Sequence, residues 1–274
     1  MKLALVTGAG SGFGYLTTLT LLQQGMHVIA TMRTLQTAEN LQQEAKNKNL
    51  AEQLTILQMD VTDLEQIETV QKYITSKFNR LDLLVNNAGF CQGGFVSDLT
   101  VKDWRRQMAV NVDGTFQVTK QMITLLEKSE KANIINVSSV SGFIGFPGMS
   151  AYCSSKHALE GFSESLRIEL LPKNIYVSLV EPGSYQTKIW EKSLSGIDPL
   201  DMEEDEMKKS VLRYAKSAAS GGANPQEVAD LITKISRQKK PKLRYPLGKR
   251  IKTIYYAKKL LPWSLLERIV MKQL

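Results

Sequence analysis

Short apolar runs alternate with longer amphipathic stretches along the first 180 residues of the chain. The apolar runs are rich in β-branched and aliphatic residues and show little alternation with polar ones, as expected for strands covered on both faces. Because a helical stretch separates each run from the next, the pattern predicts βαβ units in one doubly wound, parallel sheet. The predicted strands are Leu3–Val6, Val28–Met32, Leu54–Met59, Leu81–Val85, Ile134–Val137 and Ile175–Val180.

The stretches between these strands predict helices on both faces of the sheet. Thr62 or Asp63 is suited to cap the helix after the third strand, because either side chain can accept a hydrogen bond from a free N–H group. The two longest helices are predicted from Val101 to about Lys128 and from Tyr152 to Leu171, the second ending at Pro172. Together these elements make a Rossmann-type three-layer α/β sandwich.

The strand pattern stops between residues 184 and 224. This segment contains Pro199, several glycines and the acidic run Asp201–Glu206, and it predicts short helices in place of another strand. A long insertion at the carboxyl end of a strand is more often a lid over a site than a separate domain. We therefore predict one domain over residues 1–274 with a small helical lid at 184–224.

The positive charge of the chain is concentrated near its C-terminus. The net charge is +8, but residues 234–274 contain thirteen Lys or Arg residues and one acid, which leaves the remainder at −4. Residues 245–274 are predicted to form a basic tail of two short amphipathic helices, the second with a capping box of Ser264 and Glu267. We favour a tail that closes over the predicted site or a subunit contact, and a peripheral membrane contact stays open. Nucleic acid is not expected as a partner, because no base-reading module is visible.

Cysteine and histidine are too sparse to predict disulfide or metal chemistry. Cys91 and Cys153 lack CxxC or ligand spacing, and His27 and His157 have no third partner. A free cysteine is usually a small buried hydrophobe, so a thiol nucleophile is not expected, and this cysteine usage fits a reducing cytoplasm. The first residues are predicted to be a strand rather than a signal peptide, and no apolar run is long enough for a membrane-spanning helix.

A glycine-rich loop, Thr7-Gly8-Ala9-Gly10-Ser11-Gly12-Phe13-Gly14, joins the first predicted strand to the first helix. Glycine allows the positive φ of such a turn, a close approach of the backbone to a pyrophosphate, and tight packing of the helix on the strand. The free N–H groups and the positive dipole end of the helix then face an anion. A tight turn without a ligand is the alternative, but the strand before it and the helix after it favour dinucleotide binding.

The end of the second predicted strand bears on which dinucleotide is bound. A carboxylate there would favour NAD through the adenosine ribose, whereas a cation would favour the 2′-phosphate of NADP. Met32 offers no carboxylate, while the guanidinium of Arg33 is suited to a bidentate phosphate contact, to which Ser11 and Thr34 could add hydroxyl groups. We therefore predict NADP(H), with NAD(H) less favoured, against the alternative that Arg33 is only a solvated loop cation.

Three sequence motifs are more specific in combination than any one of them alone. They are the TGxxxGxG loop at Thr7–Gly14, the segment Asn86-Asn87-Ala88-Gly89 after the fourth strand, and Tyr152-Cys153-Ser154-Ser155-Lys156. Together they resemble the short-chain dehydrogenase/reductase family in its single-domain subtype, most strongly over residues 1–190. The resemblance implies a nicotinamide-dependent oxidoreductase that interconverts an alcohol and a ketone or aldehyde.

The resemblance also implies a catalytic role for four residues. Tyr152 and Lys156 lie one helical turn apart on one face, so the ammonium of Lys156 can favour the phenolate of Tyr152, which exchanges a proton with the substrate oxygen. In the family pattern Lys156 also binds the nicotinamide ribose, Ser139 orients the substrate carbonyl, and Asn111 holds a water that connects to the lysine. Only the family spacing selects Ser139 from the neighbouring serines, and without the motifs all four would be ordinary helix and turn residues.

The same resemblance extends the cofactor site beyond the glycine loop. Asp60 and Val61 match the pair that meets the adenine ring, although Asp60 could simply begin a turn. The segment Asn87–Gly89 matches the wall of the adenosine side, and Pro182-Gly183 with Thr187 matches the contact to the nicotinamide carboxamide. The predicted cofactor residues are Thr7, Gly8, Ser11, Gly12, Phe13, Gly14, Arg33, Asp60, Val61, Asn87, Ala88, Gly89, Tyr152, Lys156, Pro182, Gly183 and Thr187, and no residue is expected to bind a metal.

The residues expected around the substrate are mostly apolar. They predict a bulky, hydrophobic alcohol or carbonyl compound, of steroid, retinoid or lipid type by analogy, although they could equally be the core of the lid. A non-catalytic dinucleotide sensor or scaffold on the same fold is the alternative function, and the complete set of four catalytic residues argues against it. A homo-oligomer, either a dimer or a tetramer, is expected. The residues predicted near the substrate are Cys91, Phe95, Ser141, Phe143, Phe146, Met149, Tyr185 and Trp190.

Overall fold

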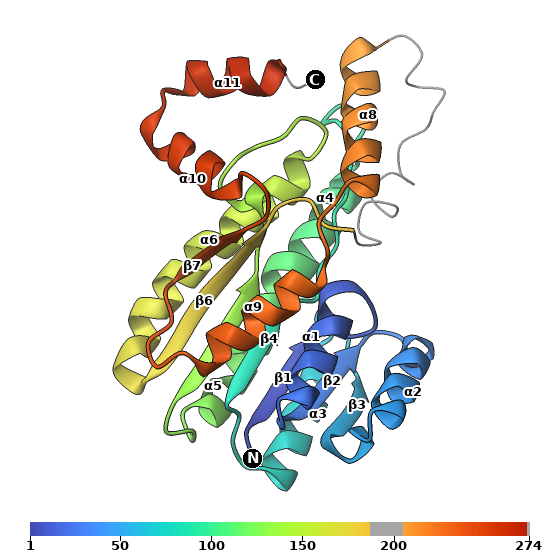
Figure 1. The fold of residues 1–274 in the computed structure, drawn as a ribbon, viewed down its shortest axis with the longest axis vertical. Coiled ribbons are helices and arrows are strands. Elements are labelled where there is room, and N and C mark those ends of the chain that lie inside the picture. Colours follow the sequence, from blue (N-terminus) through green and yellow to red (C-terminus); the bar gives the residue numbers. More distant parts are fainter. Residues whose placement is uncertain (187–204, 273–274) are drawn as a thin grey trace.

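A computed structural model describes residues 1–186 and 205–272 of the chain and shows a parallel sheet at its centre (Figure 1). Its strands run in the order β3-β2-β1-β4-β5-β6-β7, which reverses direction at β1. This is the doubly wound arrangement, so the predicted fold class is confirmed. The strands are β1 (Leu3–Thr7), β2 (His27–Met32), β3 (Leu54–Gln58), β4 (Leu83–Asn86), β5 (Ala132–Val137), β6 (Ile175–Pro182) and β7 (Arg244–Leu247).

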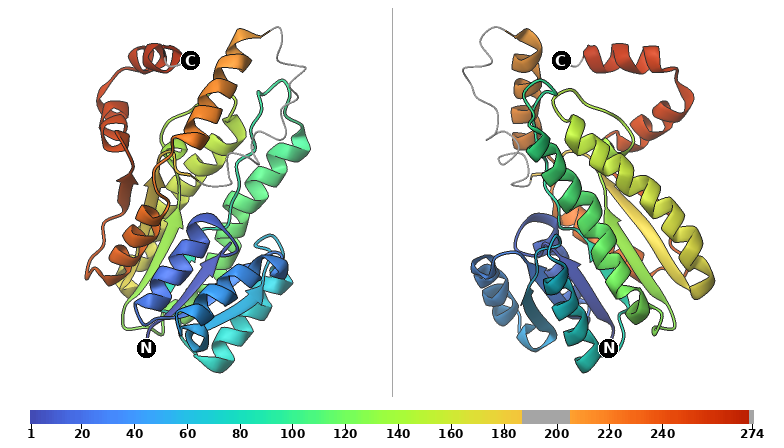
Figure 2. Two further views of the ribbon diagram at one scale, coloured as in Figure 1. Left: turned by 45° about the vertical axis from the view of Figure 1, so that its right-hand side comes forward. Right: turned by 180° about the vertical axis from the view of Figure 1, so that it is seen from behind.

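Helices cover both faces of this sheet (Figure 2). The helices of the described residues are α1 (Gly12–Gln23), α2 (Glu39–Asn47), α3 (Leu64–Lys77), α4 (Val101–Met108), α5 (Gly114–Leu126), α6 (Ser150–Leu170), α8 (Glu206–Ser220), α9 (Gln226–Arg237), α10 (Ile251–Leu260) and α11 (Trp263–Met271). Side chains of α1, α2 and α9 pack with Ala4 and Val6 of β1, whereas those of α3, α5 and α6 pack with Leu3 and Leu5. Since consecutive strand residues point to opposite faces and both faces are covered, every residue of β1 is buried, which explains the continuous apolar run.

The carboxyl ends of β1 and β4 lie side by side where the strand order reverses. In doubly wound sheets, ligands bind in the crevice outside this point. Thr7 ends β1 and Asn86 ends β4, so the glycine loop and the segment Asn87–Gly89 both begin there. The fold therefore brings two of the three motifs together.

The strand β7 was not part of the expected pattern. The six predicted strands agree with the structure to within two residues at each end, but Arg244-Tyr245-Pro246-Leu247 contains no apolar run. It pairs with β6 at the edge of the sheet, where the missing N–H group of Pro246 is tolerated. The short length of the strand and the presence of Arg244 and Pro246 explain why no strand was expected here.

Two helix predictions need correction. The single helix expected from Val101 to Lys128 is instead α4, a five-residue π-helical segment at Ala109–Asp113, and α5. In the tail, α10 and α11 occur where expected, but the capping box of Ser264 and Glu267 is wrong, because α11 begins after Pro262 and has no side-chain cap.

Two further helix predictions can be compared with the structure. Asp63, rather than Thr62, caps α3, and its Oδ1 accepts the N–H group of Gln66 at 3.1 Å. The described part of the predicted lid contains the 15-residue helix α8. Residues 187–204 of the lid lie outside the described part of the chain, so the short helices expected there stay a prediction.

Candidate active site

Side-chain hydrogen bonds join the loops that follow β1 and β4. Thr7 Oγ1 accepts the N–H groups of Asn87 and Ala88 at 3.0 and 2.9 Å. In return, Asn87 Nδ2 donates to the carbonyl oxygens of Thr7 and Gly8 at 2.8 and 3.1 Å. These bonds hold the two loops together as one wall at the carboxyl edge of the sheet.

Two glycines allow the close packing of this wall. Gly8 has a φ of +66°, and a Cβ atom there would lie 2.8 Å from the Cα atom of Ala88. A Cβ atom on Gly14 would lie 2.4 Å from both the Gly8 carbonyl oxygen and Asn87 Nδ2. Any larger residue at either position would displace backbone atoms of the loop.

The N-terminus of α1 remains open beside these glycines. Ser11 precedes the helix with an extended backbone and makes no side-chain cap, and the first turn contains no acidic residue. The unpaired N–H groups of Gly12, Phe13 and Gly14 and the positive end of the helix dipole therefore form an anion-binding position. This geometry fits a pyrophosphate group.

Arg33 is the cation nearest the end of β2. Its side chain is exposed and forms no ion pair or hydrogen bond with residues in the described part of the chain, while Met32 before it is buried. No carboxylate occupies the first two positions after β2, where a bound ribose would need one. Arg33 therefore presents an exposed guanidinium, without an ion pair in the described part of the chain, directly after β2.

Asp60 and Val61 lie at the end of the neighbouring strand, β3. The Asp60 carboxylate accepts hydrogen bonds from the N–H and Oγ1 groups of Thr62 at 2.9 and 2.7 Å. Asp60 therefore begins a turn, as the alternative to an adenine contact predicts. Val61 packs closely against Gly114, the first residue of α5. A Cβ atom added to Gly114 would lie 2.7 Å from Val61 Cγ2. Contact of this pair with an adenine ring stays a prediction.

Tyr152, Lys156 and Ser139 gather at the carboxyl end of β5. Tyr152 lies in the first turn of α6 with Lys156 one turn later, and Ser139 precedes the short 3₁₀ turn Val140–Gly142. Lys156 Nζ lies 5.7 Å from the centre of the Tyr152 ring and donates to the carbonyl oxygen of Val137 at 2.8 Å. All three side chains are buried, so they meet the site with fixed geometry.

Burial controls the protonation of these groups. It raises the pKa of Tyr152 well above its usual value, with a further increase from Cys91, and a hydrogen bond with Ser139 only partly offsets the rise. Burial also lowers the pKa of Lys156 to about 8. The expected lowering of the Tyr152 pKa by Lys156 is therefore not seen in this structure, and the Tyr152 hydroxyl is protonated at neutral pH.

Asn111 lies in the π-helical segment between α4 and α5. Its Oδ1 accepts the N–H group of Phe90 at 3.1 Å, and its Nδ2 donates to the Phe90 carbonyl at 3.0 Å and to Ser155 Oγ at 3.1 Å. The widened turn is a common feature of functional sites. Here it aims Asn111 at the loop after β4 and at the residue next to Lys156, while its role in holding a water stays a prediction.

An apolar pocket opens beside Tyr152 and Ser139, with about 640 Å³ of space that includes an opening to solvent. Five of the eight residues predicted near the substrate line it, together with Phe13, Pro182 and Gly183 from the predicted cofactor set. The lining residues are Phe13, Cys91, Ser138, Ser139, Val140, Ser141, Phe146, Met149, Tyr152, Pro182, Gly183, Ser184 and Tyr185.

Phe143 and Phe95, also predicted near the substrate, have other partners in the structure. Phe143 packs edge-on against Tyr255 of α10 with ring centres 5.2 Å apart. The centre of the Phe95 ring lies 5.7 Å from Lys208 Nζ. Neither residue lines the pocket, and contact of either one with a substrate stays a prediction. Thr187 and Trp190 lie outside the residues that the structure describes.

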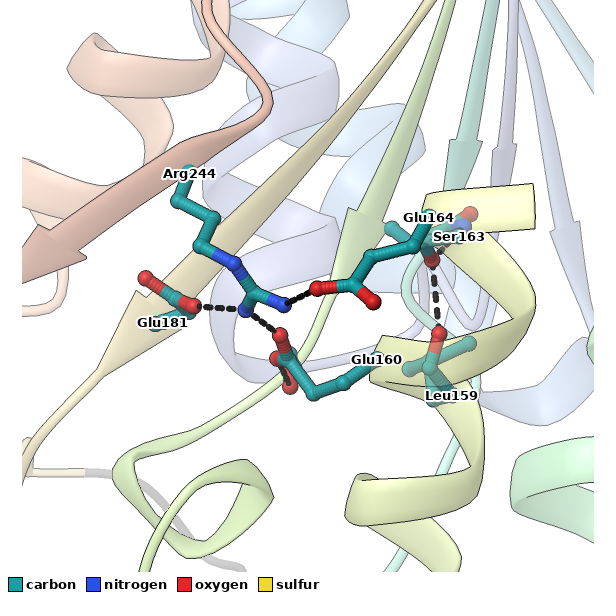
Figure 3. A network of polar contacts seen from close by, with 8 residues as sticks. Leu159, Glu160, Ser163, Glu164, Glu181 and Arg244 are labelled. Carbon is teal, nitrogen blue, oxygen red and sulfur yellow. Dashed lines mark hydrogen bonds and ion pairs between the residues drawn. The ribbon is translucent and has the colours of Figure 1, made fainter. Parts of the chain in front are cut away.

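A network of charged side chains around Arg244 was not expected from the sequence (Figure 3). Arg244 of β7 contacts Glu160, Glu164 at 2.5 Å and Glu181 at 2.7 Å, and Glu160 accepts a hydrogen bond from Ser138. Glu181 is fully buried, and burial raises its pKa to about 8, partly countered by Lys259. The network connects α6, which carries Tyr152 and Lys156, and Ser138 to the edge strand β7, through side chains that share no sequence motif.

Both cysteines, Cys91 and Cys153, are free and buried. Burial raises the pKa of the Cys91 thiol to about 12, so it stays protonated beside Tyr152. Within residues 1–186 and 205–272, no group of three His, Cys, Asp or Glu side chains is arranged to hold a metal ion. No helix in the same part of the chain is long and apolar enough to cross a membrane.

Comparison with known proteins places this site in one family. The family model described as short chain dehydrogenase matches residues 2–197. The oxidoreductase YusZ of Bacillus subtilis is 45% identical over 277 residues, covering 100% of this chain and 98% of the relative. The 3-ketodihydrosphingosine reductase of Bacteroides thetaiotaomicron is 31% identical, covering 93% and 90%. The NADPH-dependent 3-dehydrocapnine reductase of Ornithobacterium rhinotracheale is 30% identical, covering 100% and 98%.

Solved structures show the same fold. A short-chain dehydrogenase/reductase from Burkholderia phymatum, solved with NAD, superposes with a TM-score of 0.80 at 24% identity, covering 94% of this chain and 92% of that one. ElxO with NADP bound gives a TM-score of 0.71 at 28% identity, covering 86% and 92%. Proteins of this fold therefore include examples with either dinucleotide.

Proposed function

The chain belongs to the short-chain dehydrogenase/reductase family and is an oxidoreductase, and on that premise we propose that it uses NADP(H) to interconvert a bulky hydrophobic alcohol and its ketone or aldehyde. The observation that carries the proposal is the meeting of Ser139 and Tyr152 in one apolar pocket, with Lys156 behind the tyrosine ring. A non-catalytic role would not require this arrangement.

The loops at the carboxyl edge of the sheet fit a dinucleotide. The open N-terminus of α1 suits the pyrophosphate, and Thr7, Asn87 and Ala88 form the neighbouring wall. Arg33 suits the 2′-phosphate of NADP, and the NADPH-dependent relative supports the same choice. Pro182 and Gly183 line the pocket, where they would meet the nicotinamide end.

The protein groups supply the proton and the electrostatic stabilisation. A bound nicotinamide dinucleotide supplies or accepts the hydride. In the reductive direction, the Tyr152 hydroxyl donates its proton to the substrate oxygen, while the Ser139 hydroxyl donates a hydrogen bond to the same atom. Lys156, when protonated, stabilises the phenolate that remains. The raised pKa of Tyr152 favours this direction, because the hydroxyl is protonated at neutral pH.

The pocket supports a hydrophobic substrate. Phe146, Met149 and Val140 supply apolar surface next to the two catalytic hydroxyl groups. No charged side chain lines it within the described part of the chain, so a small charged metabolite would find no counter-ion. The relative named as a 3-ketodihydrosphingosine reductase supports a long-chain ketone as the first compound to test.

Consumption of NADPH tests the proposal. We expect the purified protein to oxidise NADPH with long-chain or polycyclic ketones and aldehydes, and to prefer them over small charged 2-oxo acids. Tight NADPH binding without turnover of any compound in the panel would instead support the non-catalytic sensor and overturn the proposed reaction.

A further inference from the structure

The helices α10 and α11 project from the body of the molecule. Figure 1 and both views of Figure 2 show α11 standing clear of the sheet and of the helices that cover it. Ile251 is the buried residue of α10, and Leu266 is the buried residue of α11. Most of this 21-residue stretch, Ile251–Met271, therefore presents its side chains to the surroundings.

Large apolar side chains occupy the exposed surface of both helices. Tyr256 and Leu260 lie at i and i+4 on α10 and are 61% and 80% exposed. Leu265 and Ile269 have the same spacing on α11, and each is 42% exposed. Trp263, the first residue of α11, is 56% exposed. An exposed apolar patch of this kind on a protein surface marks an interaction site.

Cations flank this apolar surface. Arg268 and Lys272 lie at i+3 and i+7 from Leu265, so they border the stripe of Leu265 and Ile269. On α10, Lys252 lies one turn before Tyr256, and Lys258 Nζ lies 4.6 Å from the centre of the Trp263 ring.

The charge of the projecting segment is not balanced locally. Residues 249–274 contain seven Lys or Arg residues and one acid. None of the cations in residues 249–272 forms an ion pair with another residue that the structure describes. The segment therefore combines exposed apolar residues, a tryptophan and unpaired positive charge.

We propose that α10 and α11 dock on the headgroup region of an anionic lipid bilayer, with Leu260, Trp263, Leu265 and Ile269 inserted and the cations at the lipid phosphates. Amphipathic helices with Trp and Leu on one side and Lys or Arg beside them bind in this way. Residues 1–233 carry a net charge of −4, so an anionic bilayer repels this part of the protein. The protein therefore approaches the bilayer with its basic tail first.

A second copy of the chain fits the patch less well. In a two-fold interface the same surface lies on both partners, so the seven cations would face one another. Closure of the tail over the pocket is also disfavoured, because the exposed apolar side chains would have to leave their present positions and turn inward. An anionic surface is the occupant that matches both the charge and the apolar residues.

Docking would hold the pocket near the lipid. Tyr255 of α10 packs against Phe143, and a Cβ atom on Gly183, which lines the pocket, would lie 2.6 Å from Ile251 of α10. The base of the docking segment is thus fixed beside the pocket wall. A membrane-dissolved substrate would then be close at hand, and this consequence rests on the proposed function.

Co-sedimentation of the full-length protein with vesicles tests the docking without any substrate. We expect the protein to bind phosphatidylcholine vesicles that contain about one third phosphatidylserine, and to bind pure phosphatidylcholine at least about tenfold more weakly. Raising the salt concentration should weaken the binding. Equal binding to both vesicle types, or binding to neither, would overturn the proposal, whatever the protein does with NADPH.

Two pairs of variants locate the binding surface. Leu265→Ser/Ile269→Ser and Arg268→Glu/Lys272→Glu should each lower the vesicle partition coefficient at least about tenfold. The matched controls are Val96→Ser/Ile168→Ser and Lys46→Glu/Lys77→Glu, which change exposed residues distant from the tail in the sequence. These variants should bind vesicles as the unmodified protein does. Vesicle binding unaffected by the tail variants contradicts the assignment. The patch would be assigned to a second copy of the chain if two results were obtained together. The parent protein would form a dimer and fail to bind vesicles, and Leu265→Ser/Ile269→Ser would dissociate that dimer.

Discussion

Lys156 has an ionisation that falls within the range of an enzyme assay. Burial lowers its pKa to about 8, so its ammonium is lost as the pH rises through that value. Since kcat/KM reports groups of the free enzyme, we expect kcat/KM for carbonyl reduction to fall above about pH 8.

The variant Lys156→Arg tests this assignment, because a guanidinium stays charged in this range. Its maximal rate should be lower, but the fall above pH 8 should disappear from its pH profile. Lys120→Arg, at an exposed position, should keep the parent profile. If kcat/KM of Lys156→Arg fell above pH 8 in the same way as that of the parent, a group other than Lys156 would titrate in this range.

Arg33 decides the choice of cofactor in our proposal. Loss of a charge-assisted contact to the 2′-phosphate should weaken binding by about 1.5–3 kcal/mol, or roughly 10- to 150-fold. We therefore expect Arg33→Ala to raise the Kd for NADPH by this factor and to leave the Kd for NADH nearly unchanged, as measured by fluorescence titration. Arg105→Ala, another exposed arginine, is the control. A parent protein that binds NADH more tightly than NADPH would contradict the role of Arg33.

Individual site residues could be predicted where their pattern is local. Tyr152 and Lys156 are four residues apart on one helix, and the glycine loop is one continuous segment. The partners Arg244 and Glu160 are 84 residues apart and belong to no repeating pattern, so only the folded chain shows their contact. The raised pKa of Tyr152 was likewise hidden, because it depends on burial and on Cys91, which lies far away in the sequence.

At the level of elements, Arg244 connects β7 to β6 and α6. Three carboxylates share its one guanidinium, and Glu181 is the one with no exposed surface. Its pKa, raised to about 8, means that the folded protein retains a proton which the unfolded chain releases near pH 4.5. The free energy of unfolding therefore decreases as the pH rises between these two values, by about 1.4 kcal/mol per pH unit for this group.

The variant Glu181→Gln should remove this dependence, because its amide cannot ionise. We expect its free energy of unfolding, relative to that of the parent, to increase by up to about 1.4 kcal/mol per unit between pH 5.5 and 7.5 in urea titrations. Glu164→Gln removes an exposed partner of the same guanidinium and is the matched control. A relative stability of Glu181→Gln that does not change with pH would show that Glu181 is ionised throughout the range.

Elements were predictable in proportion to their apolar pattern. The six strands with apolar runs are predicted from the sequence, whereas β7 is not, because it has only four residues and Arg244 and Pro246 interrupt its apolar character. The π-helical segment at Ala109–Asp113 was also missed, because a single widened turn leaves the helical periodicity on either side almost unchanged.

At the scale of the whole molecule, the fold followed from the order of strands and helices. Right-handed crossovers between parallel strands leave few sheet orders open, and the observed order is one of them. The projection of α10 and α11 could not be predicted in this way, since an amphipathic pattern does not show which of its surfaces is covered. The homo-oligomer stays a prediction, which light scattering of the parent and of the tail variants would test together.

The central claim is that this molecule transfers a proton through Tyr152 while NADPH is oxidised. Its most direct test is the rate of NADPH oxidation by Tyr152→Phe with a substrate that the parent reduces. General acid catalysis contributes about 10²- to 10⁴-fold, so the variant should lose about this factor in kcat. It should still bind NADPH, and Tyr73→Phe should keep the parent rate. Unchanged turnover by Tyr152→Phe would contradict the account.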